Sequence, residues 1–446
     1  MAGIAGIGAE NRNADVERAL QQIDHRGRGQ RGVFTAPGAT LGAVWGAAQP
    51  DSLLLTGHAV QDRTGGGRLA SARMEEGELV LTRDHVGLAP LYYGRLADGC
   101  VCFASEFKAI CQLTGDVHEL PPGHRWEAGA VQPSGPAVPP AEDVPETPEE
   151  IARELRRRLQ DAVRRCLSTS NVGSWLSGGL DSSTMAALAR PQTSVFHTFA
   201  AGLAGAPDLE FAREVAAHIG SRHHEVLVTL ADMLRALPEV IYHLESFDAL
   251  LVRSSITNYL VAQCASEWVA EVFSGEGGDE LFAGYEYLRS IPSAKLAAEL
   301  LDITGRLHNT ALQRVDRCAS AHGLVPHVCF LDPGVMTLAL AIPARWKLHD
   351  DVEKWILRQA VADLLPDRVL WRRKAKFWEG AGVGELLSEE AEQKISDQDF
   401  ARQRLLPNGW QLNTKEELMY YRAFREHYAD AGDLSWMGRT KGAPVH

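Results

Sequence analysis

Residues 174–183, SWLSGGLDSS, constrain the fold of this chain more than any other segment. A strand-like apolar run that ends at Leu176 meets the helical run DSSTMAALA with only Ser177, Gly178 and Gly179 between them. Backbone N–H groups at such a turn converge on the start of the helix, where they can bind an anion. The segment therefore predicts a phosphate-binding loop between a strand and a helix.

The side chains of this loop favour a phosphate ligand accompanied by a cation. Asp181 falls in the first helical turn, where a carboxylate can hold Mg²⁺ against phosphates, and the hydroxyls of Ser177, Ser182 and Ser183 can donate hydrogen bonds. The pattern GxxxxGK[ST] is absent from the sequence, which argues against an ordinary Walker loop. The alternative is a helix cap without a ligand, but two glycines, an aspartate and three serines exceed what a cap needs.

Composition narrows the class of protein. The chain has 446 residues and a formal charge of −13, and its Lys and Arg residues are scattered. These features predict an enzyme-sized protein with small-molecule partners, and they disfavour nucleic acid or membrane as a partner. No apolar run reaches the roughly 18 to 20 residues of a membrane helix, and no signal peptide is evident, so a cytoplasmic protein is expected. The seven cysteines are odd in number and dispersed, which predicts free, mostly buried thiols.

The chain divides at a Pro-rich segment. Residues 131–148 are rich in proline and acid and predict an exposed linker between domains at 1–130 and 149–446. Thr147 and Glu150 form a capping pattern ahead of a long helical run. The first domain shows short alternating runs between glycine-rich turns, typical of antiparallel β-structure. The second alternates strand-like and helical runs, which predicts an α/β fold with a parallel sheet.

The phosphate-binding loop and several longer stretches of the chain resemble a known family. SGGLDSS matches the pyrophosphate-binding loop of the N-type ATP pyrophosphatases, and residues 150–446 resemble glutamine-dependent asparagine synthetase. Supporting stretches are VIYHLESFDALLVRSSITNYL, FSGEGGDELFAGYEYL and KLHDDVEKWILRQAVADLLPDRVLWRRKAKF. MAGIAGI, HRGRGQRG and FASEFKAI resemble the glutaminase domain of the same family. The resemblance implies a glutaminase-like (Ntn-type) β domain followed by a PP-loop ATP pyrophosphatase domain, with ATP and Mg²⁺ as ligands.

The resemblance also implies roles for individual residues. The loop 176–183, with Ser274 and Gly275, would bind ATP and its pyrophosphate, and Asp181 and Asp279 would hold Mg²⁺. The residues implied in catalysis are Lys374, which would stabilise charge on the phosphates, Arg253, which would support adenylation, and Glu276, which would lie near the attacking amine. Taken singly, each has an ordinary alternative as a surface charge or a helix-start carboxylate.

The first domain departs from its family at the residues that bind and hydrolyse glutamine. Ala2 replaces the nucleophilic cysteine, and an alanine cannot attack an amide. Only Gly57 of an expected Asn-Gly-Glu motif remains at residues 55–58, no arginine lies between Arg31 and Arg63, and a block after residue 71 is missing. Four losses predict natural inactivation, with the domain kept for packing or for a homodimer.

The implied activity is an AMP-forming amide ligase in amino-acid or natural-product biosynthesis. Val325 and His327 replace a family glutamate and arginine, and Leu250 and Leu251 replace threonines. These changes predict a more apolar pocket, so the carboxylate would be aspartate or an analogue, joined to ammonia or a small amine. The alternatives are an intramolecular cyclase of the β-lactam or lasso-peptide kind, which Glu276 disfavours, and a non-catalytic nucleotide-binding partner.

Overall fold

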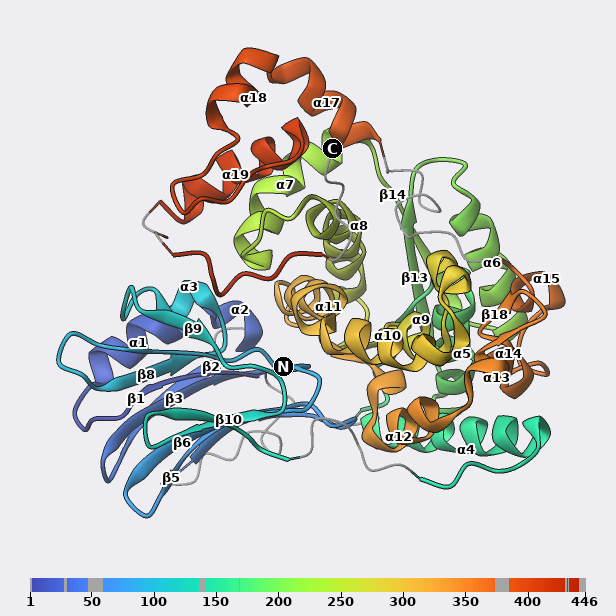
Figure 1. Cartoon of the computed structure of the whole chain (residues 1–446), viewed down its shortest axis with the longest axis horizontal. Coiled ribbons are helices and arrows are strands. Elements are labelled where there is room, and N and C mark those ends of the chain that lie inside the picture. The colour runs from blue at the N-terminus through green and yellow to red at the C-terminus, as the bar shows by residue number, and fades with distance from the viewer. Residues whose placement is uncertain are drawn as a thin grey trace.

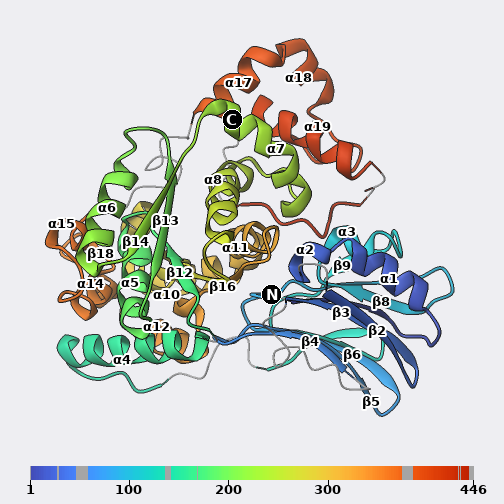
Figure 2. The same cartoon turned by 180° about the vertical axis from the view of Figure 1, so that it is seen from behind.

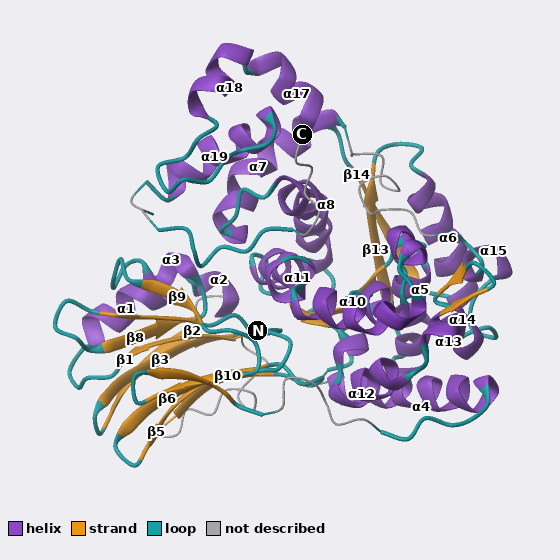
Figure 3. Cartoon of the chain, in the orientation of Figure 1, coloured by secondary structure: helices purple, strands orange, loops and turns teal. Residues whose placement is uncertain are grey.

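The computed structural model describes the chain except for residues 1, 28–29, 47–58, 136–141, 168, 374–384, 430, 432 and 441–446. Lys374 and residues 55–58, both named above, lie outside the described residues. The antiparallel β domain and the α/β domain lie side by side, and the C-terminal helices pack above them (Figure 1). Strands gather in the first domain and in the centre of the second (Figure 3).

The first domain is built of two antiparallel sheets, as the alternating runs predict. Among the described residues their strand orders are β2-β3-β1-β8-β7-β9 and β11-β10-β6-β5-β4. The strands are β1 (Ala2–Ile7), β2 (Gln30–Ala36), β3 (Ala39–Trp45), β4 (Ala59–Arg63), β5 (Leu69–Glu75), β6 (Glu78–Arg83), β7 (Tyr92–Arg95), β8 (Val101–Ala104), β9 (Val117–Glu119), β10 (His124–Glu127) and β11 (Ala130–Pro133). The helices are α1 (Asn13–Gln21), α2 (Asp24–Gly27) and α3 (Phe107–Ile110).

Strand β1 is buried on both faces and joins two cores. Ile4 packs with Leu41, Leu81 and Phe103 between the two sheets. Ile7 belongs to a second cluster, which also contains apolar residues of α1, α3 and the helices α7 (Leu230–Leu244), α8 (Ala249–Ser266) and α19 (Lys415–His427). Because alternate side chains of a strand point to opposite faces, the run AGIAGI can serve both clusters. The two domains therefore share a continuous apolar core.

The predicted helix after the linker is present. Helix α4 (Pro148–Cys166) begins with a capping box in which the Glu150 N–H donates to Thr147 Oγ1 and the Glu150 carboxylate accepts from the Thr147 N–H. Its buried face includes Ile151, Leu155 and Leu159, at the four-residue spacing of a helix face. Strand β11 covers residues 130–133, so the antiparallel sheet extends into the start of the predicted linker.

The second domain contains the predicted parallel sheet. Its order is β14 (Arg222–Leu227), β13 (His197–Gly202), β12 (Val172–Trp175), β15 (Glu271–Phe273), β16 (Val325–His327). Helices α5 (Leu180–Ala189) and α6 (Pro207–Ile219) cover one face, and α8 and α11 (Ala311–Ser320) cover the other (Figures 1 and 2). The chain runs outward from β12 in one direction and then returns to add β15 on its other side. Ligands of such sheets bind at this switch point, beyond the carboxyl ends of the two central strands.

The remaining elements surround this sheet. They are α9 (Gly278–Phe282), α10 (Ser293–Gly305), α12 (Pro333–Ala341), α13 (Ala344–Lys347), β17 (Leu348–His349), β18 (Val352–Glu353), α14 (Trp355–Ala360), α15 (Asp367–Leu370), α17 (Leu386–Lys394) and α18 (Asp397–Gln403). None of the described helices has the length and apolar character needed to cross a membrane. All seven cysteines are free, as predicted.

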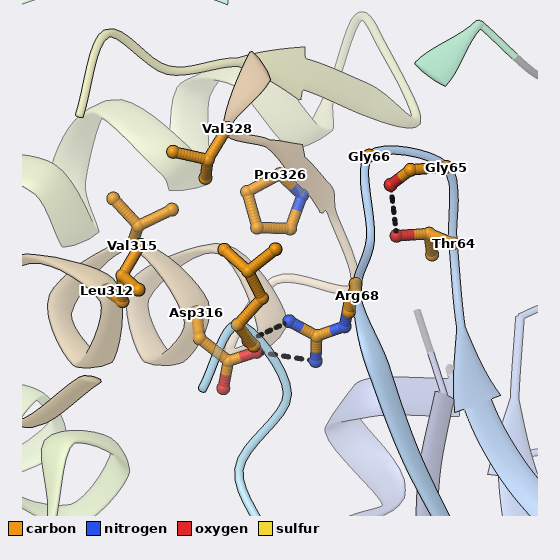
Figure 4. Close-up of a pocket in the computed structure, with 10 residues that line it drawn as sticks. Thr64, Gly65, Gly66, Arg68, Leu312, Val315, Asp316, Pro326 and Val328 are labelled. Atoms are coloured by element: carbon orange, nitrogen blue, oxygen red, sulfur yellow. Dashed lines mark hydrogen bonds and ion pairs between the residues drawn. The ribbon is translucent and has the colours of Figure 1, made fainter. Parts of the chain in front are cut away.

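A buried network of charges crosses the boundary between the domains. Asp316 accepts hydrogen bonds from Arg26 and from Arg68, whose Nη2 lies 2.8 Å from Asp316 Oδ1 (Figure 4). Arg317 Nη2 lies 3.0 Å from Glu245 Oε2, and Lys108 Nζ lies 3.1 Å from Glu245 Oε1. The members are Arg26, Arg68, Glu106 and Lys108 of the first domain and Glu245, Asp316 and Arg317 of the second, and none is more than 4% exposed. We call this set the interdomain network.

Candidate active site

The predicted phosphate loop lies at the switch point of the parallel sheet. Strand β12 ends at Trp175, and Gly179 is the N-cap of α5. Gly178 has φ of +69°, and a Cβ there would lie 2.6 Å from the backbone nitrogen of Ala212 in α6. This position therefore requires glycine for both its conformation and its close approach to α6.

Two of the three loop serines are placed to meet a ligand. Ser177 Oγ and Ser182 Oγ lie 3.0 Å apart, and Ser182 Oγ also accepts from the Ser177 N–H at 3.2 Å. Both residues are partly exposed. Ser183, in contrast, is fully buried. Ser183 Oγ has no hydrogen-bond partner among the described residues, and its contact with a ligand stays a prediction.

The two predicted metal-binding carboxylates converge on one lysine. Lys354 Nζ lies 2.5 Å from Asp181 Oδ2 and 2.6 Å from Asp279 Oδ1. Asp181 comes from the helix after β12, and Asp279 from α9 after β15. A Cβ on Gly278 would lie 2.5 Å from Asp181 Cγ, so the absence of a side chain at Gly278 allows the two loops to meet.

Sequence reasoning missed Lys354, although it lies within a stretch that supported the family resemblance. Its backbone is left-handed, with φ of +55°, and its side chain is only 3% exposed. A non-glycine residue in this conformation, with a buried ammonium group, is the kind of local strain that collects at functional sites. No local motif marks the residue, because its partners Asp181 and Asp279 are distant in the chain.

The residues present fit a magnesium ion that arrives with phosphates. Mg²⁺ prefers oxygen ligands and is commonly held by one or two carboxylates together with substrate phosphates and water. Asp181 and Asp279 supply two such carboxylates, and they already enclose a positive charge, the Lys354 ammonium. The part of the chain that the structure describes contains no cluster of three or more metal-binding side chains. Most of the coordination would therefore come from the nucleotide.

Electrostatics beside Asp279 limit the negative charge of the site. Glu280 is fully buried, and its carboxylate accepts a hydrogen bond from Tyr285 Oη. Burial, and then the charge of Asp279, raises the pKa of Glu280 to about 7. Glu280 is thus partly protonated near neutral pH and adds less than a full charge to the pair formed by Asp181 and Asp279.

Arg372 braces the phosphate loop from outside, a second contact that sequence reasoning missed. Its Nη1 donates to the carbonyl oxygens of Ser177 and Gly178, at 3.4 and 3.1 Å, and its Nη2 lies 2.5 Å from Asp208 Oδ1. The guanidinium group also lies over the ring of Phe211, 4.0 Å from its centroid. Arg372 therefore connects the loop to α6. Its Nη1 and Nη2 groups bind protein oxygen atoms rather than a ligand.

The structure places Arg253 and Glu276 in separate ion pairs. Arg253 Nε lies 3.1 Å from Glu416 of α19, and Tyr420 Oη donates to the same carboxylate. Glu276, in the loop between β15 and α9, lies 2.5 Å from Arg314 Nη2. Arg314, which was not singled out from the sequence, also donates to Ser254 Oγ at 3.0 Å.

The more apolar substrate pocket stays a prediction, and the structure shows what surrounds His327. This residue is buried in β16, and its Nε2 lies 2.9 Å from Glu271 Oε2 in the neighbouring strand. Burial disfavours the charged ring, but the nearby Cys166 thiol and the Glu271 carboxylate outweigh burial and raise the pKa of His327 to about 9. His327 and Glu271 therefore form a hydrogen-bonded pair between two neighbouring strands of the sheet.

The chain is similar to proteins of a known family. A family model described as asparagine synthase matches residues 154–303 and 292–442. The chain belongs to the asparagine synthase family. A second model, described as a glutamine amidotransferase domain, matches residues 57–125, a range that does not include Ala2.

Curated relatives agree with the family assignment. The chain is 36% identical over 378 residues to "Asparagine synthetase [glutamine-hydrolyzing] 2" of Arabidopsis thaliana, with 78% of this chain and 64% of the relative covered. It is 34% identical to "Asparagine synthetase B [glutamine-hydrolyzing]" of Escherichia coli K12, with 79% and 68% covered. The chain thus spans about 64% of the length of the Arabidopsis relative. Among solved structures, an NMN synthetase from Francisella tularensis covers 65% of this chain and 98% of its own, at 14% identity and a TM-score of 0.30.

Proposed function

We propose that this member of the asparagine synthase family is an ATP-dependent, AMP-forming amide ligase that does not use glutamine. It joins a small carboxylate, aspartate or an analogue, to ammonia or a small amine. The observation that carries the proposal is the convergence of Asp181, Asp279 and Lys354 beside the Gly178 turn, at the switch point of the sheet. A phosphate loop, two carboxylates and a buried ammonium are the components that a pyrophosphate leaving group needs.

The chain's own residues account for the first chemical step. A carboxylate oxygen of the substrate attacks the α-phosphorus of ATP, the bond to the β-phosphate oxygen breaks, and an acyl-adenylate and pyrophosphate result. The N–H groups at the start of α5 and the Lys354 ammonium stabilise the negative charge that develops on the leaving group. Mg²⁺, held by Asp181 and Asp279, would supply further charge neutralisation.

Glu276 serves the second step, in which an amine displaces AMP. Arg314 holds its carboxylate at 2.5 Å and thereby fixes its position. Glu276 can stabilise the positive charge on the attacking nitrogen and accept its proton. We expect Glu276→Gln to reduce amide formation by about 100-fold but to reduce carboxylate-dependent pyrophosphate exchange much less. Both rates can be measured on one preparation, and an equal loss of both would assign Glu276 to adenylation or folding instead.

Arg372 should control the affinity for ATP through the loop that it braces. Arg372→Ala frees the carbonyl groups of Ser177 and Gly178, so the loop loses its fixed geometry and KM for ATP should rise by about 10-fold or more. Arg368→Ala is the matched control, because Arg368 lies over the same Phe211 ring but pairs with the exposed Glu210. Equal KM values for the two variants would show that the brace has no role.

The absence of glutamine use rests on the first domain. The side chain of Ala2 is 1% exposed and packs in the core between the sheets, and its carbonyl oxygen accepts from Arg26. Arg31 is engaged with Glu17 and Asp24. Position 2 thus has no nucleophile, and its surroundings are occupied by packing and ion pairs.

A restored cysteine should therefore remain inactive. We expect Ala2→Cys to release no glutamate from glutamine above background, even when the cysteine is the mature N-terminus, because the contacts that a glutaminase requires are missing. The measurement is glutamate release, with ammonium-dependent AMP formation on the same protein as the control. Glutamine hydrolysis by Ala2→Cys would contradict this reading of the domain.

The proposal as a whole is tested by pyrophosphate release. The full chain is given ATP, Mg²⁺ and ammonium with each member of a panel of carboxylic acids, beginning with aspartate. At least one carboxylate should produce AMP, pyrophosphate and amide in equal amounts. If ATP binds in calorimetry but no carboxylate causes pyrophosphate release, the chain is a nucleotide-binding partner and the proposal fails.

A further inference from the structure

Two cysteines far apart in the sequence meet beneath the parallel sheet, outside the phosphate site. Cys166 is the last residue of α4, and Cys329 begins the short 3₁₀ helix η4 (Cys329–Leu331). The Cys329 thiol donates a hydrogen bond to Cys166 Sγ, and the two sulfur atoms lie 3.5 Å apart. Both residues are buried, at 2% and 0% exposed.

The pair has a histidine and a glutamate beside it. His327, two residues before Cys329, interacts with Cys166, and its Nε2 lies 2.9 Å from Glu271 Oε2. The hydrogen bond from Cys329 and, to a lesser degree, the nearby His327 ring lower the pKa of Cys166 to about 6. A thiolate is the form of cysteine that attacks electrophiles, so Cys166 is the activated member of the pair.

A small cavity at the domain boundary lies beside the segment that carries His327. It is lined by Gly65 and Gly66 of the turn between β4 and β5, and by Pro326 and Val328, which flank His327 (Figure 4). A Cβ on Gly66 would lie 3.0 Å from Cys166 Sγ, so the turn between β4 and β5 packs closely against this sulfur.

We propose that Cys166 and Cys329 are a redox-active dithiol that a hydroperoxide converts into an intramolecular disulfide. The Cys166 thiolate attacks one oxygen of hydrogen peroxide, the O–O bond breaks, and the other oxygen leaves as water with a proton from the His327 ring. The Cys166 sulfenic acid is then attacked by Cys329 sulfur, which loses its proton as the hydroxyl group leaves as a second water. The two sulfur atoms lose two electrons, Cys329 and the His327 ring each supply one proton, and one peroxide becomes two waters.

The other buried cysteines lack these features. Burial raises the pKa of Cys102 and of Cys318 to about 12, so neither is a thiolate at neutral pH. Cys318 donates to a backbone carbonyl oxygen, that of Ser255, rather than to a second sulfur. Oxidation should therefore begin at the pair, although the half-exposed Cys100, Cys111 and Cys264 are closer to solvent.

The test is a map of oxidation in the full-length protein. The reduced chain is titrated with hydrogen peroxide under native conditions, remaining thiols are alkylated, and peptides are identified by mass spectrometry without reduction. We expect a peptide cross-linked through Cys166 and Cys329, lighter by two hydrogen atoms, before any other cysteine reacts, and its reversal by dithiothreitol. Oxidation that begins at Cys100, Cys111 or Cys264 while the pair stays reduced would overturn the proposal.

Variants separate the steps. Cys329→Ser should leave a Cys166 sulfenic acid that a cyclic 1,3-diketone traps, and Cys102→Ser, the buried control, should cross-link as the unaltered chain does. His327→Gln should slow formation of the disulfide by about 10-fold or more, since it removes the proton donor. An unchanged rate in folded His327→Gln would remove the histidine from the mechanism, and absence of a trapped adduct in Cys329→Ser would refute attack by Cys166.

Discussion

Asp181→Asn or Asp279→Asn should each reduce carboxylate-dependent pyrophosphate release by about 100-fold or more. Even the outer partners of metal ligands typically account for 10- to 100-fold, so loss of a ligand should cost at least as much. The substitution is nearly isosteric and removes one negative charge from a pair that encloses the Lys354 ammonium. In either variant Lys354 keeps one carboxylate, so the fold should persist.

The control for these variants is Asp302→Asn. Asp302 pairs with Arg306 at the exposed surface of α10, and its loss should leave turnover unchanged. Circular dichroism on all three proteins separates loss of chemistry from loss of fold. Near-normal turnover of either Asp181→Asn or Asp279→Asn would show that the carboxylate does not act on the pyrophosphate.

The second large effect concerns stability. Asp316→Asn should lower the free energy of unfolding by about 3 to 5 kcal/mol, because it removes one carboxylate from a buried network in which Arg26, Arg68 and Arg317 share it. Such networks need not be more stable than apolar packing, but the loss of one member leaves buried charge uncompensated. Urea unfolding followed by tryptophan fluorescence measures the change, and exposed Asp302→Asn should lie within about 0.5 kcal/mol of the unaltered chain.

The same residue predicts a dependence on pH. Burial opposes ionisation of Asp316, but the charges of Arg26 and Arg68 outweigh burial and hold its pKa well below the usual range. A carboxyl whose pKa is lower in the folded state stabilises the fold above its unfolded pKa of about 3.9 and loses that effect as the pH falls toward the folded value. The difference between Asp316→Asn and the unaltered chain should therefore be full at neutral pH and shrink below about pH 4. A constant difference down to pH 2 would contradict the charge assignment.

Local patterns in the sequence predicted the fold well. The capping residues Thr147 and Glu150, the Gly178 turn and the alternation of strands and helices each depend on neighbours a few residues apart, so they could be read directly. Asp181 was predicted from its place in the first helical turn and Asp279 from the family resemblance, and the structure brings the two carboxylates together.

The contacts that the sequence did not predict join segments that are far apart in the chain. Lys354 and Asp181 are 173 residues apart, and Cys166 and Cys329 are 163 apart. The role of His327 depends on which residue of the adjacent strand faces it, and strand register is set by the whole sheet. The replacement of the family arginine by His327 does not by itself reveal that His327 pairs with Glu271.

The interdomain network constrains some residues of the first domain more strongly than others during evolution. If the first domain has no glutaminase activity, as proposed, the residues of its glutamine site are not constrained by that reaction. The opposite holds for four residues of the network, because replacing any of them leaves a buried charge of the second domain without one of its partners. These residues are Arg26, Arg68, Glu106 and Lys108. A gene copy that discarded the first 130 codons would encode a synthetase domain with Glu245, Asp316 and Arg317 stripped of partners. Selection on the proposed amide formation would thus be enough to preserve the first domain without any glutaminase activity. In further chains of this lineage we expect the glutamine site to vary while Arg26, Arg68, Glu106 and Lys108 are kept together.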